Sequence, residues 1–160
     1  MNAPSHLPHP DFAGKAPPRS AAFGPFRLEI LSPKDVQEDF EVVVGSAGVL
    51  QGLFGNPWPS GLTLEENMED LERHEREFLN DQAFAWIIRS EAGRYLGCAY
   101  LKPDREAPGT AKVFTWIRND PDRALQVATF NTAFLEWVRP HLPVGYALSV
   151  TSNGAGFPGD

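Results

Sequence analysis

One stretch of the chain combines residue types that suit the binding of an anion. The run Ala111–Arg118 is rich in β-branched and aromatic residues, which are typical of a strand. From Arg123 to Val138 the apolar residues recur every three or four positions, which predicts an amphipathic helix. The segment from Asn119 to Asp122 interrupts both patterns and predicts a tight loop. Because the first N–H groups of a helix have no acceptor within the helix, an anion can bind at such a junction.

The other residues with reactive side chains form no recognisable catalytic group. Cys98 is the only cysteine and lies in a strand-like run, which indicates a packing role. The histidines lack the spacing of a zinc site, so we expect no bound metal: His6, His9, His74 and His141. Nucleophile-elbow, dinucleotide-binding and calcium-loop motifs do not occur in the sequence. The sequence therefore names no catalytic residue.

Composition limits the class of partner. The 160 residues suit a single domain, and the hydrophobic content of 42% is ordinary for a folded protein. The net charge is −7 and the basic residues form no cluster, which argues against nucleic acid and anionic membrane surfaces as partners. The apolar runs are too short to span a bilayer and the N-terminus has no apolar signal core, so we expect a cytoplasmic protein.

The chain divides into three predicted parts. Residues 1–25 are rich in proline, which predicts a flexible arm without helix or paired strand, in which His6 and His9 are solvated. Residues 26–150 carry the regular apolar patterns of a folded domain. Residues 151–160 are rich in glycine and predict a tail.

Strands and helices are predicted in a definite order within residues 26–150. The predicted strands are Phe26–Leu31, Ala83–Arg89, Tyr95–Leu101, Ala111–Arg118 and Val144–Val150. A helix after the first strand has an apolar face made of Val36, Phe40 and Val43. Thr63 and Glu66 fit a capping box that starts a second helix, whose many charged residues predict a solvated face.

This order, together with three segments of sequence, resembles the GNAT superfamily of acyl-CoA-dependent N-acyltransferases. The segments are GRYLGCAYLKP (residues 93–103), AKVFTWIRND (residues 111–120) and WPSGLTLEENMEDLERHEREF (residues 58–78), the last being similar to a divergent bacterial subgroup. The resemblance covers about Phe26–Val150 and implies an α+β fold, with a mixed, mostly antiparallel central sheet flanked by helices. It also implies that the C-terminal part of the superfamily fold is abbreviated here.

The resemblance assigns a coenzyme role to the predicted strand–loop–helix unit. The superfamily's loop, Arg/Gln-x-x-Gly-x-Gly/Ala, corresponds to residues 123–128, where Arg123 and Ala128 fit the pattern and Gln126 replaces the central glycine. The implied acetyl-CoA contacts come from the backbone of Trp116, Ile117 and Arg118 towards pantetheine, and from Arg123, Ala124, Leu125 and Ala128 towards the pyrophosphate. The alternative is a simple turn capped by Asn119, Asp120 or Asp122, whose acidic side chains repel a pyrophosphate.

Catalytic groups are incomplete by the same comparison. The predicted strand Ala111–Arg118 contains no acid to act as the base, and no tyrosine matches the position that protonates the departing thiolate. Trp58 and Tyr100 are candidates for an acceptor pocket, although aromatic residues of this kind also form cores.

Two functions remain open on the sequence. The first is transfer of an acetyl group from acetyl-CoA to a primary amine of a small molecule or of a protein N-terminus. The second is a GNAT-like module that has lost catalysis and binds a partner, through a surface that contains Trp58, or Leu53 and Phe54, if these residues are exposed together. An open gap between the last two strands of the sheet favours the first, and strands that pair along their whole length favour the second.

Overall fold

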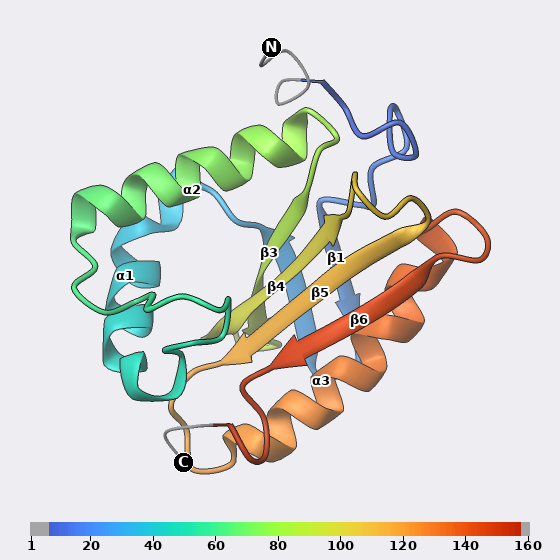
Figure 1. Cartoon of the computed structure of the whole chain (residues 1–160). Coiled ribbons are helices and arrows are strands. Elements are labelled where there is room, and N and C mark those ends of the chain that lie inside the picture. Colours follow the sequence, from blue (N-terminus) through green and yellow to red (C-terminus); the bar gives the residue numbers. More distant parts are fainter. Residues whose placement is uncertain (1–6, 158–160) are drawn as a thin grey trace.

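The computed structural model describes residues 7–157. They form one six-stranded sheet with helices on both of its faces (Figure 1). The strands are β1 (Ser20–Phe23), β2 (Phe26–Ile30), β3 (Phe84–Ser90), β4 (Tyr95–Pro103), β5 (Thr110–Ile117) and β6 (Ala147–Ser152). The helices are α1 (Val36–Gly45), α2 (Leu64–Leu79) and α3 (Arg123–Val138), with short 3-10 turns η2 (Pro33–Asp35), η3 (Ala47–Val49) and η4 (Arg139–His141). The strands follow chain order across the sheet, and every neighbouring pair is antiparallel except β5 and β6. The predicted mixed, mostly antiparallel α+β fold is confirmed.

The sheet separates two apolar layers. Helices α1 and α2 cover one face, and α3 covers the other (Figure 1). On the α3 face, the ring of Phe134 lies 5.7 Å from that of Trp86. On the α1 and α2 face, Val43 and Leu71 pack with Ile87 of β3. Because β3 and β4 are covered on both sides, their apolar residues follow one another without alternation.

The segment before Pro25 differs from its prediction as an unpaired arm. Residues Ser20–Phe23 form β1, which pairs antiparallel with β2 along its whole length. Gly24 makes the connecting turn possible with a φ of 55°, a conformation that glycine adopts without steric cost. Pro17 and Pro18 precede the strand and Pro25 lies in the turn after it, so no proline interrupts its pairing. The prediction missed β1 because its four residues carry no β-branched side chain.

His9 is buried, so its prediction as a solvated residue is wrong. Only 4% of its surface is exposed, and its backbone N–H donates to Asp81 O at 2.9 Å. The neighbouring Phe12 is fully buried, with its ring 5.3 Å from Phe84 and 5.8 Å from Tyr146. Phe12 therefore fastens the N-terminal segment to the core. His6 lies outside the described residues, as does the predicted tail from residue 158.

The last strand lies slightly later in the chain than predicted. It begins at Ala147 instead of Val144, because Gly145 has a φ of 83° and interrupts the extended backbone. It continues to Ser152, and Asn153 after it is fully buried. Within residues 7–157, no helix has the length and apolar content needed to cross a membrane.

Candidate functional site

The predicted strand, tight loop and helix are present as β5, a loop and α3. The loop is closed by two backbone hydrogen bonds, from Asp120 N–H to Arg118 O at 2.7 Å and from Arg123 N–H to Asp120 O at 3.1 Å. Helix α3 then begins at Arg123, with Asp122 as its N-cap. The junction predicted to suit an anion therefore has the predicted backbone.

Strands β5 and β6 pair over six positions, from Thr110 with Ala147 to Thr115 with Ser152. Beyond this ladder, the side chain of Asn153 takes the place of a further strand residue. Its Oδ1 accepts from Ile117 N–H at 3.0 Å, and its Nδ2 donates to Ile117 O at 2.9 Å and to Val49 O at 3.0 Å. The Asn153 amide therefore closes the end of the space between the two strands.

The three residues expected to pair with pantetheine all lie at this end of β5. Trp116 is paired with Cys98 of β4, and its indole N–H donates to the hydroxyl of Tyr100 at 3.1 Å. Arg118 N–H donates to Leu96 O at 2.8 Å. The backbone of Ile117, the one residue of the three that faces β6, is held by Asn153. Their contact with a coenzyme stays a prediction, which requires the Asn153 side chain to move.

The four residues expected near a pyrophosphate have different environments. Arg123 is 7% exposed and its Nε donates to Asn153 O at 2.8 Å, so its side chain packs inward. Leu125 is 69% exposed, Ala128 is exposed and Ala124 is half-buried. Ala124 and Leu125 stand in the first turn of α3, where backbone N–H groups lack intrahelical acceptors. These two N–H groups are the donors that the predicted loop offers to an anion.

The acidic residue at the start of the loop is neutralised. The carboxylate of Asp120 accepts two hydrogen bonds from Arg94, at 2.7 and 3.0 Å, and lies 3.7 Å from Arg118 Nε. The hydrogen bond from Arg94 lowers the pKa of Asp120, so this group is ionised and paired at neutral pH. Asp122 makes no side-chain cap to the helix, and its Oδ1 accepts from Gln126 Nε2 at 3.0 Å. Repulsion of an anion by Asp120 is therefore reduced by its two arginine partners.

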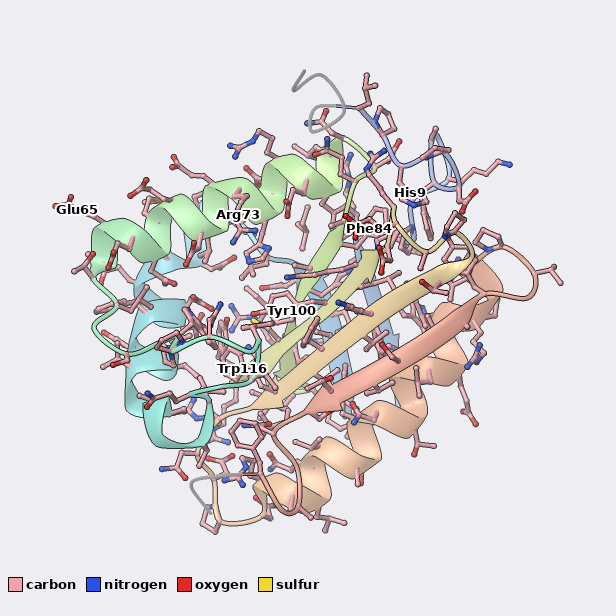
Figure 2. All side chains as sticks on the ribbon, in the orientation of Figure 1. His9, Glu65, Arg73, Phe84, Tyr100 and Trp116 are labelled. Carbon is pink, nitrogen blue, oxygen red and sulfur yellow. The ribbon has the colours of Figure 1, made fainter. Side chains whose placement is uncertain are left out.

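A cavity of about 200 Å³ lies on the other side of the sheet, between α1, α2 and β4. Its lining includes Trp58 and Tyr100, the two residues predicted to form an acceptor pocket. Phe54 adds a third ring, 5.2 Å from Trp58 and 5.3 Å from Tyr100. Figure 2 shows Arg73 on α2 and Tyr100 on β4 beside the space between that helix and the sheet. The structure therefore brings the predicted pair into one cavity.

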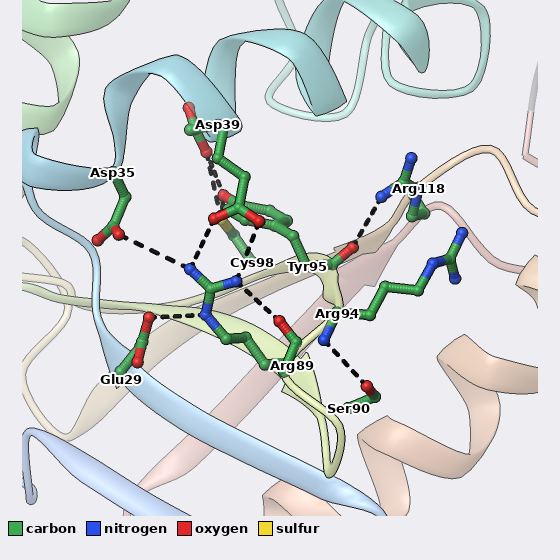
Figure 3. Close-up of polar contacts among 11 residues, drawn as sticks. Glu29, Asp35, Asp39, Arg89, Ser90, Arg94, Tyr95, Cys98 and Arg118 are labelled. Carbon is green, nitrogen blue, oxygen red and sulfur yellow. Dashed lines mark hydrogen bonds and ion pairs between the residues drawn. The ribbon is translucent and has the colours of Figure 1, made fainter.

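A buried carboxylate forms part of the cavity wall. Asp39 is 3% exposed; its Oδ2 accepts from Asn67 Nδ2 at 2.8 Å and its Oδ1 accepts from the Tyr95 hydroxyl. That hydroxyl also lies 3.2 Å from Cys98 Sγ (Figure 3). Burial raises the pKa of Asp39, and it raises the pKa of Tyr95 and of Cys98 well above their usual values. Cys98 is thus a buried thiol, in agreement with the packing role expected for it.

Sequence reasoning missed Asp39, although a signal was present. Asp39 falls three residues after Val36 and four before Val43, on the buried face of α1. The prediction placed Phe40 on that face, but Phe40 is only half-buried. An acid at an apolar position of an amphipathic helix indicates a buried polar contact.

The opposite wall of the cavity is basic. The ammonium of Lys102 lies 5.1 Å from the ring centroid of Phe54, 5.4 Å from that of Phe114 and 5.9 Å from that of Tyr100. Burial, with a smaller effect from the charge of Arg73, lowers the pKa of Lys102. Burial also lowers the pKa of His74 to about 3, so this imidazole is neutral at physiological pH. The basic charges of this wall therefore come from Lys102 and Arg73, and Asp70, which also lines the cavity, lies 3.5 Å from Arg73.

A separate ion-pair cluster fastens α1 to the sheet (Figure 3). Arg89 on β3 donates to Glu29 at 2.7 Å and to Glu38 at 2.8 Å, and it lies 3.7 Å from Asp35. None of these four residues lines the cavity. We therefore assign this cluster to structure.

No protein-family model and no curated protein sequence matches this chain. Solved structures similar to it include a protein of Vibrio cholerae named as a ribosomal-protein-serine acetyltransferase, which is 12% identical. That match has a TM-score of 0.56 and covers 77% of this chain and 66% of the other. A GCN5-related N-acetyltransferase of Brucella melitensis is 20% identical, with a TM-score of 0.59 over 88% of this chain and 60% of the other.

A third similar structure is the microcin C7 self immunity acetyltransferase MccE, in complex with acetyl-CoA and AMP. It is 12% identical, with a TM-score of 0.64 over 86% of this chain and 75% of the other. The chain thus spans less than two thirds of the Vibrio and Brucella proteins. These likenesses show that the chain has the fold of the GCN5-related N-acetyltransferases, which confirms the resemblance found in the sequence.

Proposed function

We propose that this protein is an acyl-CoA-dependent N-acyltransferase that transfers an acetyl group to a primary amine. The observation that carries the proposal is the junction of β5 and α3, where the N–H groups of Ala124 and Leu125 stand at an exposed helix start beside the parallel pair β5 and β6. An exposed helix N-terminus is suited to a pyrophosphate. The acetyl-CoA in the similar MccE structure supports the same choice of co-substrate.

In this reaction the amine nitrogen forms an amide bond with the acyl carbon as the carbon–sulfur bond breaks. The thiolate leaves with a proton, and the amine loses one. The cavity lined by Trp58 and Tyr100 is our candidate site for the amine, because Trp58 also lies 6.5 Å from the ring of Trp116 on β5. The amine and the acetyl-CoA would then lie on the two sides of the C-terminal end of strand β5. We propose a small-molecule amine in preference to a protein N-terminus, because the cavity holds only about 200 Å³ and lies between α1, α2 and β4.

Entry of pantetheine requires one change in this structure. Its amides can pair with Ile117 only if the side chain of Asn153 leaves the Ile117 N–H and C=O groups. In this exchange the two hydrogen bonds between Ile117 and Asn153 are replaced by two hydrogen bonds between Ile117 and pantetheine. The remaining cost is the hydrogen bond that the Asn153 side chain loses to Val49 O. Asn153 is therefore the residue that a bound coenzyme has to displace.

Calorimetric titration with acetyl-CoA tests the proposal. We expect micromolar binding to the wild type and at least about tenfold weaker binding to Leu125→Glu, because the new carboxylate stands beside the pyrophosphate. A glutamate in the first turn of a helix is favourable for folding, so the variant should keep its stability.

Leu64→Glu is the matched control, since Leu64 is also an exposed leucine in the first turn of a helix, α2. Binding weaker than about 1 mM in the wild type, or equal binding by all three proteins, would contradict the proposal. Release of free thiol from acetyl-CoA in the presence of small primary amines then measures turnover.

A binding module without catalysis is the second candidate. It is favoured by the Asn153 amide, which already satisfies Ile117, and by the absence of an acidic residue on β5. This candidate predicts neither acetyl-CoA binding nor thiol release. Acetyl transfer to any amine would exclude it.

A further inference from the structure

The cavity on the α1 and α2 face has an acidic end and a basic end. Cys98, Tyr100 and Lys102 alternate along β4 and therefore point to the same face of the sheet. Asp39 Oδ1 lies 4.0 Å from Cys98 Sγ, which places the acid at one end of this row. Lys102 stands at the other end, about 13 Å further along the strand at about 3.3 Å per residue. The two charged walls are thus separated along β4, with Tyr100 between them.

Lys102 is the basic group without an acidic partner. No carboxylate lies within ion-pair distance of its ammonium among residues 7–157, and its neighbours are three aromatic rings. Arg73, by contrast, lies 3.5 Å from both Asp70 and Glu77. His74 is neutral and adds no charge. A partly buried cation without a counter-ion is unfavourable, and an anionic ligand removes this cost.

The middle of the cavity is lined by three aromatic rings, with Phe54 edge-on to Trp58 and to Tyr100. The rings of Phe54, Trp58 and Tyr100 face it from a loop and from β4. Its volume of about 200 Å³ is below the range of about 300–1,000 Å³ typical of drug-sized ligands. One cation without an ion-pair partner beside three rings suits a single negative charge on a small aromatic body, since aromatic rings pack edge to face with one another.

We propose that this cavity binds a small aromatic carboxylate that carries an amine at the far end of its ring, with the carboxylate paired to Lys102 and the ring against Phe54, Trp58 and Tyr100. Because this amine stands across the ring from the carboxylate, it lies towards Asp39, whose carboxylate oxygens can each accept a further hydrogen bond. This end of the cavity is level with the end of β5, since Cys98 pairs with Trp116. The assignment of this amine as the acyl acceptor rests on the proposed function, and the binding of the carboxylate does not.

Calorimetry of the full chain, without any thioester, tests the site with three probes. These are 4-aminophenylacetate, phenylacetate, which lacks the amine, and phenylacetamide, which has the same shape as phenylacetate but no charge. We expect both carboxylates to bind at least about tenfold more tightly than the amide. Lys102→Met should weaken the carboxylates by at least about tenfold and leave the amide unchanged.

Lys112→Met is the matched control, because Lys112 pairs with Lys102 across the strands but is exposed and does not line the cavity. It should bind all three probes like the wild type. Lys102→Arg keeps the cation, and it should retain carboxylate binding if Lys102→Met fails to fold. Equal binding of phenylacetate and phenylacetamide, no loss in Lys102→Met, or no binding of any probe at about 10 mM would overturn the proposal.

The same titrations separate this site from the proposed function. Carboxylate binding without acetyl-CoA binding contradicts the acyltransferase and leaves the site in place. Acetyl-CoA turnover with other amines, without binding of the carboxylates, overturns the site alone.

Discussion

At the scale of single residues, the cavity depends on ionisable groups whose charge is changed by burial. His74 lies on a helix that carries many charged residues, yet its side chain is only 12% exposed and its ring lies 5.4 Å from that of Tyr100. Burial and the charges of Arg73 and Lys102 lower its pKa to about 3. The wall of the cavity therefore stays free of an additional charge at physiological pH.

This depressed pKa makes stability depend on pH. Between about pH 6.5 and pH 3 the unfolded chain binds a proton at His74 and the folded protein does not, so stability falls as pH falls through this range. The contribution is about 1.4 kcal/mol per pH unit below 6.5. His74→Gln removes this group, and we expect its free energy of unfolding in urea to fall less steeply than that of the wild type between pH 7 and pH 5. Parallel pH dependences of the two proteins would show that His74 titrates normally.

At the scale of the elements, β4 and β5 approach each other closely at Gly97. A Cβ atom at this position would lie 1.8 Å from Trp116 O and 2.8 Å from Trp116 C. Both are backbone atoms of the strand that carries the candidate coenzyme site, so no side chain can move to make room. The glycine thus fixes the spacing of these two strands next to Ile117.

Gly97→Ala should therefore destabilise the protein severely, by about 3 kcal/mol or more, because the strands have to separate. Gly45→Ala is the control, since Gly45 ends α1 with open space around its Cβ position, and it should be neutral or slightly stabilising. Urea unfolding of both variants measures the difference. A Gly97→Ala variant as stable as the wild type would contradict the close approach.

Elements with a local signal could be predicted from the sequence. The capping box of α2 is one example: Thr63 Oγ1 accepts from Glu66 N–H at 3.1 Å, and Glu66 Oε1 accepts from Thr63 N–H at 2.9 Å. Strand β1 could not be predicted, because its pairing depends on the Gly24 turn and on contact with β2 instead of its own residue types. Local patterns therefore identify most elements, and pairing in space decides the remainder.

The candidate sites depend on contacts between distant segments, at the scale of the whole molecule. Trp58 and Tyr100 could be nominated as aromatic residues, but the acidic and basic ends of their cavity come from α1 and β4, which no local pattern connects. The contacts of Asn153 could not be predicted either, because this residue follows β6 in a glycine-rich stretch predicted to be a tail. Its side chain joins the end of β5 to the turn after α1, and its C=O accepts from Arg123 of α3. One residue thus connects the helical layers on both faces of the sheet.

Asn153→Ala tests this connection. The variant leaves the N–H and C=O of Ile117 and the C=O of Val49 without their partner in a buried site, so we expect a loss of about 3 kcal/mol or more in the free energy of unfolding. Asn119→Ala is the matched control, since Asn119 is exposed and its recorded hydrogen bond, to Ser46, uses its backbone N–H. Because acetyl-CoA no longer has to displace the amide, its stabilising effect in thermal unfolding should be larger for Asn153→Ala than for the wild type. A variant of normal stability would show that Asn153 contributes little to the closure of β5 and β6, and an unchanged response to acetyl-CoA would place the coenzyme away from Ile117.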